Sequence, residues 1–292
     1  MSSTHSSLVA GLPVTERKLD VDGLSTAIIE GGAGRPVVLL QPEFRAVWMR
    51  VVPDLVTTHR VIAADLPGLG ASVSDGRFDA DRVLAWLADL IGQTCDSAPI
   101  LVGKGPAGAL AARYAIDHEV DRLVLVDSHG LAPFRPPLGM IVSFAGVMLR
   151  PTERRLDKSF RKYCYTDADR VRADMGESYD ALAAYALDLF RTPSFRTAMR
   201  RLGSWMSAPI PPEALDRITV PTALIWGRHD VGMPLRVAEA ASARFGWPLH
   251  VIEDARDDPG LEQPEAFLAA FRAFAGVPGL RGTPDFNSPT GV

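Results

Sequence analysis

Short aliphatic runs alternate along this chain with longer segments whose apolar residues recur at helical spacing. In the middle of the chain, the runs Pro99 to Val102 and Leu123 to Asp127 have the composition of parallel strands that are buried on both faces. Between them lie a glycine-rich turn, Gly103 to Gly108, and a helical segment that ends near Asp117. This order predicts a βαβ unit. Whatever the turn holds at the start of the helix is the first candidate for function.

The same alternation extends over most of the chain. Residues 14–31 predict a hairpin that turns at Asp22-Gly23, because this dipeptide is a strong signal for a two-residue turn. The other expected strands are 36–40, 60–64, 219–226 and 248–252, and the other expected helices are 48–58, 78–94, 234–245 and 265–274.

Residues 131–215 interrupt this alternation, because they contain no convincing strand pattern. Helical segments are expected there at 138–149, 154–164, 179–190 and 195–206. The chain therefore predicts an α/β fold with a mostly parallel sheet and helices on both faces, formed by residues 1–130 and 216–276, with residues 131–215 as a helical lid. The tail, 277–292, is rich in Gly, Pro, Ser and Thr, and we expect it to be flexible.

Composition limits the classes of partner. The chain has 292 residues, 47% of them hydrophobic, and a formal net charge of -4, which gives no reason to expect a nucleic-acid partner. The apolar run 138–149 is too short to span a bilayer, and residues 1–14 do not resemble a signal peptide. Cys95 and Cys164 lack metal-binding spacing, so we expect no metal. We expect a cytoplasmic protein without a membrane partner, as a monomer or homodimer.

The glycine turn allows two interpretations. Gly103 to Gly108 spells G-x-G-x-x-G between a strand and a helix, and Asp127 follows 24 residues after the first glycine, near the position of a ribose-binding acid. This pattern indicates a dinucleotide site and an oxidoreductase. Against it, Pro106 has no N–H to offer a pyrophosphate, and the unit lies in the middle of the chain rather than at its first strand.

The second interpretation uses the whole chain from residue 14 to about 276. The loop DLPGLGAS at 65–72, the strand end WGRHD at 226–230 and the segment LEQPEAF at 261–267 occur in an order that resembles the α/β-hydrolase superfamily. The helical segments at 131–215 fall where that superfamily carries its lid. The resemblance implies an α/β-hydrolase fold, with Asp230 at the position of the catalytic acid.

The resemblance is weakest at the catalytic positions. The superfamily's turn is G-x-S-x-G, and superposing it puts Gly105 at the position of the nucleophilic serine. The next residue normally gives its N–H to the oxyanion hole, but here it is Pro106. The histidine position holds Asp257, and Gln41-Pro42 replaces the usual His-Gly pair, leaving the N–H of Glu43 as a possible donor. The resemblance therefore implies a degenerate catalytic triad, in which ordinary acyl-enzyme hydrolysis is not expected.

The carboxyl ends of parallel strands meet at one edge of a sheet, where ligands bind in this class of fold. We expect Asp230 and Asp257 to approach each other there, which would raise the pKa of one carboxyl and suit acid–base catalysis, with Lys104 neutralising the pair or polarising a carbonyl. Carboxylates bonded to water or backbone, and a structural ion pair of Lys104, remain open. The substrate-binding candidates are Gln41, Glu43, Phe44, Gly105, Pro106, Ser128, His129, Met140 and Phe144.

Three functions remain open. The preferred hypothesis is a cofactor-independent, non-hydrolytic enzyme, a cyclase, lyase or isomerase, that acts on an apolar small molecule such as a specialised metabolite. The alternatives are a catalytically inactive pseudoenzyme that binds a small ligand or protein partner, and a residual or atypical hydrolase. His129 is a further candidate for proton transfer, although a lone histidine at the end of a strand is more often a hydrogen-bonded structural residue.

Overall fold

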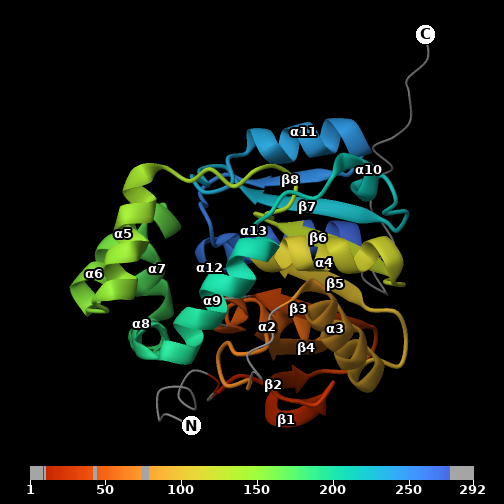
Figure 1. Ribbon diagram of the computed structural model, residues 1–292, viewed down its shortest axis with the longest axis horizontal. Helices are drawn as coiled ribbons and strands as arrows, with labels where there is room; N and C mark the ends of the chain where they lie inside the picture. Colours follow the sequence, from red (N-terminus) through yellow and green to blue (C-terminus); the bar gives the residue numbers. More distant parts are fainter. Residues whose placement is uncertain (1–8, 10, 42–44, 74–78, 277–292) are drawn as a thin grey trace.

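The computed structural model describes residues 9, 11–41, 45–73 and 79–276. Its centre is an eight-stranded sheet with the order β1-β2-β4-β3-β5-β6-β7-β8 (Figure 1). The strands are β1 (Thr15–Val21), β2 (Leu24–Gly31), β3 (Pro36–Gln41), β4 (Arg60–Asp65), β5 (Ile100–Lys104), β6 (Arg122–Val126), β7 (Thr222–Gly227) and β8 (Leu249–Ile252).

Most of the sheet is parallel. β1 and β2 form the expected hairpin, in which Asp22 and Gly23 both have positive φ angles of 50° and 74°, as a tight hairpin turn requires. β2 also runs antiparallel to β4, whereas every pair from β4 through β3, β5, β6 and β7 to β8 is parallel. The parallel arrangement brings the carboxyl ends of β3 to β8 to one edge.

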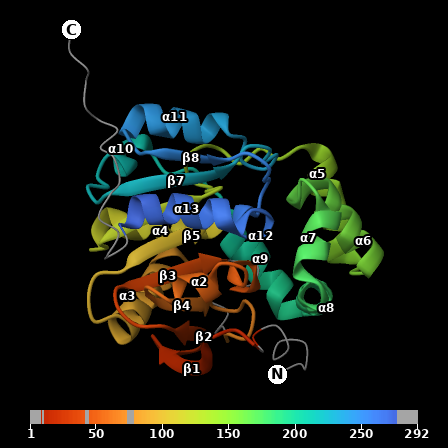
Figure 2. The same ribbon diagram turned by 180° about the vertical axis from the view of Figure 1, so that it is seen from behind.

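Helices cover both faces of the sheet (Figures 1 and 2). α3 (Ala80–Thr94) and α4 (Pro106–Asp117) lie on one face, and α2 (Val52–Leu55) and α13 (Pro264–Ala275) lie on the other. The other helices outside residues 131–215 are η1 (Arg45–Trp48), α11 (Arg236–Phe245) and α12 (Pro259–Glu262), and α10 (Pro212–Leu215) precedes β7. This confirms the predicted fold class.

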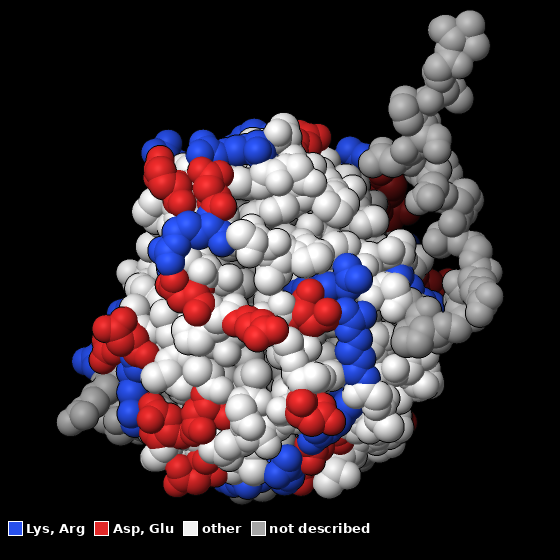
Figure 3. Space-filling model, turned by 90° about the vertical axis from the view of Figure 1, so that its right-hand side faces the viewer, with Lys and Arg blue, Asp and Glu red and all other residues white. Residues whose placement is uncertain are grey.

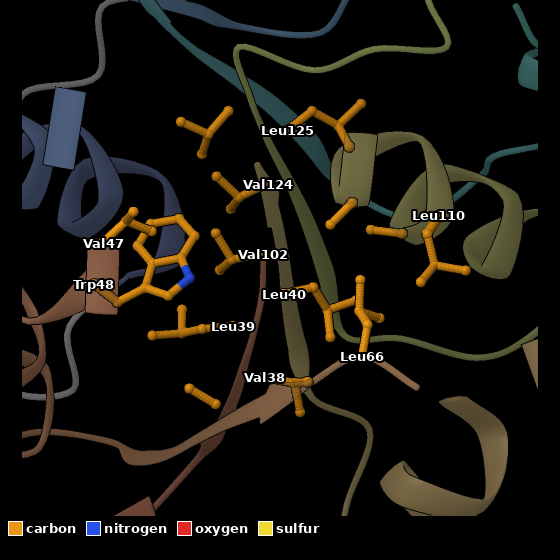
Figure 4. Packing of buried hydrophobic residues seen from close by; sticks show 14 of the residues in the cluster. Val38, Leu39, Leu40, Val47, Trp48, Leu66, Val102, Leu110, Val124 and Leu125 are labelled. Carbon is orange, nitrogen blue, oxygen red and sulfur yellow. The ribbon is translucent and has the colours of Figure 1, made fainter. Parts of the chain in front are cut away.

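The core lies between the sheet and these two helical layers. Trp48 packs against one face of the central strands, and Leu110 of α4 packs against the other (Figure 4). All residues of β3 and β5 are buried, because each strand is covered on both sides. This double burial explains why the central strands are continuous aliphatic runs without polar alternation.

A helical insertion, the segment between β6 and β7, lies at one end of the molecule (Figures 1 and 2). It contains α5 (Leu138–Leu149), α6 (Glu153–Ser159), a π-helical turn (Phe160–Cys164), α7 (Ala168–Met175), α8 (Glu177–Arg191) and α9 (Pro193–Met206). α7 was not predicted, because its sequence, ADRVRADM, is mostly polar and buries only Ala168 and Val171. Two residues of this insertion, Phe134 and Met140, lie close to Gly232, in the turn that follows the carboxyl end of β7.

The surface carries charges of both signs. On the face turned away from the insertion, Lys and Arg are interspersed with Asp and Glu (Figure 3). Such a mixed pattern gives that face no single-sign field that would attract a polyanion. In the part of the chain that the structure describes, no helix combines the length and apolar character needed to cross a bilayer.

Candidate functional site

The turn after β5 is a sharp strand-to-helix elbow. Gly105 has φ 53° and ψ -127°, a conformation that strains any residue with a side chain, and α4 begins at the next residue, Pro106. The Gly105 N–H donates to Val126 O at 2.9 Å, and its carbonyl accepts from His129 N at 2.9 Å. A Cβ built on Gly105 meets no described atom within 4 Å, so the elbow faces open space.

The outer glycines of the turn serve packing. A Cβ at Gly103 would lie 2.6 Å from Ala107 O, and one at Gly108 would lie 2.3 Å from Ser128 Oγ. Only glycine therefore lets α4 approach the strands this closely. Asp127, the candidate ribose-binding acid, instead turns towards β7, where its Oδ1 accepts from Gly227 N at 2.9 Å. The geometry explains the G-x-G-x-x-G spacing without a dinucleotide.

Asp230 is a buried carboxyl at the end of β7. Its Oδ1 accepts from Gly232 N at 2.7 Å and from Met233 N at 3.2 Å. Its Oδ2 is buried without a hydrogen-bond partner among the described residues. Burial, reinforced by the nearby Asp257 carboxylate, raises the pKa of Asp230 to about 8. The group is therefore mostly a neutral carboxylic acid at pH 7.

Lys104 lies among carboxylates. Its side chain is 5% exposed, and its Nζ is 2.9 Å from Asp258 Oδ1 and 3.4 Å from Asp257 Oδ2. The Asp257 side chain is 33% exposed, whereas that of Asp258 is only 10% exposed. Burial raises the pKa of Asp258, and the Lys104 ammonium opposes that rise. The Lys104 ammonium thus forms an ion pair with Asp257, one of the arrangements considered from the sequence. It also pairs with Asp258, which was not among the sequence candidates.

Asp127 completes what we call the carboxyl cluster: Asp127, Asp230, Asp257 and Asp258 around Lys104. Asp127 is 1% exposed and has φ 42°, a left-handed conformation that is uncommon for a residue other than glycine. Its pKa is raised well above its usual range, first by burial and then by Asp230 and Asp257. Asp127 directly follows β6, Asp230 follows β7 and Asp257 lies in the loop after β8, so the cluster is built from the segments that follow three neighbouring strands.

His129 and Ser128 lie beside the cluster. His129 Nδ1 is hydrogen-bonded to Ser207 Oγ at 2.8 Å, and its ring stacks on Phe134 at 4.2 Å between centroids. Burial lowers the pKa of His129 to about 4, so the ring is neutral at pH 7. Ser128 is fully buried and donates its hydroxyl to His129 O at 2.8 Å. Both side chains therefore have a hydrogen-bond partner within the protein.

The insertion reaches the cluster through Phe134 and α5. A Cβ built on Gly232 would lie 3.4 Å from Asp230 Oδ1, 3.5 Å from Phe134 Cε2 and 3.6 Å from Met140 Cε. One point in space therefore lies in van der Waals range of the carboxyl and of both apolar side chains. Phe144, in contrast, is near Tyr163 of the same insertion, at 6.4 Å between ring centroids.

Two of the remaining candidates, Gln41 and Pro106, lie near the ends of β3 and β5. Gln41 is 3% exposed and ends β3, in register with Asp65 of β4. Glu43 and Phe44 lie outside the described residues. Pro106 is the first residue of α4.

Glu262 is a further buried carboxyl that sequence reasoning missed. Its Oε2 accepts from Thr166 N at 2.6 Å, and its Oε1 accepts from Arg256 N at 2.7 Å. Burial raises the pKa of Glu262 to about 7. Asp257 N also donates to Cys164 O at 3.3 Å. These bonds fasten the loop that carries Asp257 to the helical insertion.

The protein has the features of the α/β-hydrolase class: a sheet of this order, a sharp elbow after β5 and an acid after β7. The sequence pattern of the Alpha/beta hydrolase family matches residues 31–270. The chain belongs to this family.

Two curated relatives and one solved structure illustrate the similarity. The chain is 26% identical over 237 residues, 76% of its length and 77% of the relative, to 2-hydroxy-6-oxo-6-(2'-aminophenyl)hexa-2,4-dienoic acid hydrolase of Metapseudomonas resinovorans. It is 31% identical over 232 residues, 74% of its length and 78% of the relative, to the magnesium-chelatase 30 kDa subunit of Rhodobacter capsulatus. The structure of 2-hydroxy-6-oxo-6-phenylhexa-2,4-dienoate hydrolase from Rhodococcus superposes with a TM-score of 0.77 at 18% identity, covering 90% of this chain and 98% of that one.

Proposed function

We propose that this protein is a cofactor-independent, non-hydrolytic enzyme that moves protons on an apolar small molecule, with Asp230 as general acid and Asp257 as general base. The observation that carries the proposal is the contrast between these two carboxyls. Asp230 is buried and has a pKa of about 8, whereas Asp257 is a third exposed and ion-paired with Lys104. Two neighbouring carboxyls in such different environments suit opposite roles in proton transfer.

The elbow supports a reaction without an acyl-enzyme. If Gly105 stands at the nucleophile position, as the family resemblance implies, the attacking oxygen is missing. Pro106 also lacks the N–H that would stabilise an oxyanion. Loss of the nucleophile costs a serine hydrolase on the order of 10⁶ in turnover, roughly 8 kcal/mol of barrier. Lysine and two carboxyls beside the elbow offer proton transfer in its place.

The proposed step conserves protons. Asp257 removes a proton from carbon next to a substrate carbonyl, and Asp230 gives its proton to the carbonyl oxygen, which forms an enol. For an isomer, Asp257 returns its proton to a different carbon and Asp230 recovers the enol O–H proton. For a ring, the enol carbon attacks a second carbonyl carbon of the same molecule, the C=O π bond of that carbonyl breaks, its oxygen takes the proton from Asp257, and Asp230 recovers the enol O–H proton. Lys104 balances the negative charge that Asp230 holds after it has donated its proton.

An apolar carbonyl compound fits the surroundings. Phe134 and Met140 approach the Asp230 carboxyl from the insertion and offer apolar contacts. The Metapseudomonas resinovorans relative is named as the hydrolase of an aromatic, conjugated oxo acid. Compounds of that kind gain and lose protons next to their carbonyl. We propose that residues 131–215 act as the lid over this substrate.

Hydrolysis is the second candidate, because the curated relatives include enzymes named as hydrolases and esterases. The open space at Gly105 could hold a water molecule where the family carries its serine hydroxyl. Asp257 would then activate that water as a general base. In this version, removal of Asp257 abolishes hydrolysis of an ester.

Deuterium exchange tests the proposal without a known substrate. Apolar ketones and conjugated oxo acids are incubated with the protein in D₂O, and exchange next to the carbonyl is followed by NMR. We expect exchange with the wild-type protein and a decrease of about 10²–10⁴-fold in Asp257→Asn and in Asp230→Asn. Asp254→Asn, which removes an exposed carboxylate from the same loop, is the matched control.

The same samples separate the alternatives. Hydrolysis of p-nitrophenyl esters without proton exchange, lost in Asp257→Asn, would favour the hydrolase. Exchange at the wild-type rate in both variants would exclude the two assigned roles. A protein that binds these compounds but exchanges and hydrolyses none of them would be a pseudoenzyme.

A further inference from the structure

One helix of the insertion exposes an unusual amount of apolar surface. The large hydrophobic residues that are exposed in the described part of the chain are Val73, Leu138, Ile141, Val142 and Leu149. Four of these five belong to α5, and their exposed fractions range from 51% to 83%. Scattered single exposures are normal on a protein surface, but a cluster on one helix indicates a binding surface.

The four residues lie on one side of α5. At 3.6 residues per turn, positions 138, 141, 142 and 149 point in similar directions, and the small residue Ala145 lies between them. The opposite side of the helix carries Val147, which is fully buried, and Met140 near the Asp230 turn. We call the outward side the α5 apolar face. Figures 1 and 2 both show α5 at the outer edge of the molecule.

The charges close to the α5 apolar face in sequence are mainly positive, and the nearest acid is Glu153 at the start of α6. Residues 128–152 contain no Asp or Glu, and their charged residues, Arg135 and Arg150, flank the two ends of α5. Arg155 of α6 also reaches α5, where its Nη1 donates to Gly146 O at 2.8 Å. All three arginines are exposed. Within the described residues, none of them has an acidic ion-pair partner.

We propose that the α5 apolar face docks on the surface of an anionic lipid bilayer. A helix with a continuous apolar side and flanking arginines has the character of helices that lie in the membrane interface, where apolar side chains enter the lipid and cations contact the headgroups. A helix that lies flat on the bilayer surface need not be long enough to cross it, so the shortness of α5 does not oppose docking. The proposal does not depend on the proposed reaction.

A second copy of the chain fits this surface less well. A twofold contact between antiparallel α5 helices would bring Arg135 of each copy towards Arg150 of the other. The 25 residues 128–152 offer no acid to balance these charges. Like charges across a contact disfavour it, whereas an anionic lipid surface balances all of them.

Vesicle co-sedimentation of the full chain tests the docking. Two kinds of vesicle are used, pure phosphatidylcholine and an equal mixture of phosphatidylcholine and phosphatidylglycerol, at low salt. We expect binding to the anionic vesicles and a decrease of more than about tenfold in Val142→Asp, because a charge at the centre of the face opposes insertion. Arg135→Gln and Arg150→Gln should each weaken binding about fivefold.

Val73→Asp is the matched control, because Val73 is 54% exposed but lies far from α5 in sequence. This variant should bind like the wild-type protein, and thermal unfolding should show that all variants fold. Absence of binding to the anionic vesicles would overturn the proposal, as would an equal loss in Val73→Asp. A dimer in solution that Val142→Asp converts to monomer, without vesicle binding, would assign the face to a second copy instead.

Discussion

Replacing Asp230 with Asn should stabilise the protein by an amount that grows with pH. The folded protein holds the Asp230 proton up to a pKa of about 8, whereas the unfolded chain releases it near the ordinary value of 3.8. Wild-type stability is therefore fully present below pH 3.8 and is lost as pH rises towards 8. The loss is about 1.4 kcal/mol per pH unit within this window. Asn has no proton to lose, and its side-chain oxygen can accept the same bonds from Gly232 and Met233.

The difference in unfolding free energy between Asp230→Asn and the wild-type protein should thus increase by about 3 kcal/mol from pH 5 to pH 7. Urea denaturation at a series of pH values measures it, and subtraction cancels groups such as Glu262 that titrate in both proteins. Asp254→Asn controls for the effect of any Asp-to-Asn change in this region. A difference that stays constant with pH, or that decreases as pH rises, would refute the assignment of Asp230 as a buried neutral acid.

Three further substitutions test the site's construction by urea denaturation. Lys104→Met should lower stability by about 3–5 kcal/mol at pH 7, because it leaves the cluster's buried carboxylates without their cation; an unchanged midpoint would contradict the pairing. Gly105→Ala should cost about 1–3 kcal/mol, although the space is open, because φ is 53°; a neutral effect would show that the elbow relaxes. Gly108→Ala should cost about 1–3 kcal/mol, because its Cβ would lie 2.3 Å from Ser128 Oγ. Gly92→Ala is the control: its Cβ meets no described atom within 4 Å, so this substitution should be neutral or stabilising.

The fold could be predicted because the composition of its strands is easy to recognise in the sequence. Strands that are buried on both faces are aliphatic throughout, and the hairpin turn requires residues that tolerate positive φ, such as Asp22-Gly23. Element ends were less accurate: the expected turn from Gly103 begins two residues later in the structure, at Gly105, because β5 extends to Lys104. α7 was missed because a helix held by two small buried side chains lacks an apolar periodicity.

The site could be predicted only in part. Lys104 and Asp230 could be placed because they lie at or just after the ends of β5 and β7, whereas Asp257 was placed only by the family resemblance; their roles stay predictions. Asp258 was missed, since nothing in the sequence shows that the start of α12 turns its side chain back towards Lys104. Asp127 was considered for a different role, because its partner, the Gly227 N–H, is 100 residues away and is known only once β6 and β7 are paired.

The raised pKa of Asp230 supports the proposed role of this residue as a proton donor. With a pKa of about 8, keeping this residue as Asp costs about 4 kcal/mol of stability at pH 7 relative to a side chain that does not titrate. A scaffold that only bound an apolar ligand would gain stability from Asn at this position. An amide cannot donate a proton to a substrate oxygen and recover it from water, whereas a neutral carboxyl can. Asp230→Asn should therefore be more stable at pH 7 and yet lose proton exchange, and a variant that gains stability without any loss of exchange would remove Asp230 from the chemistry.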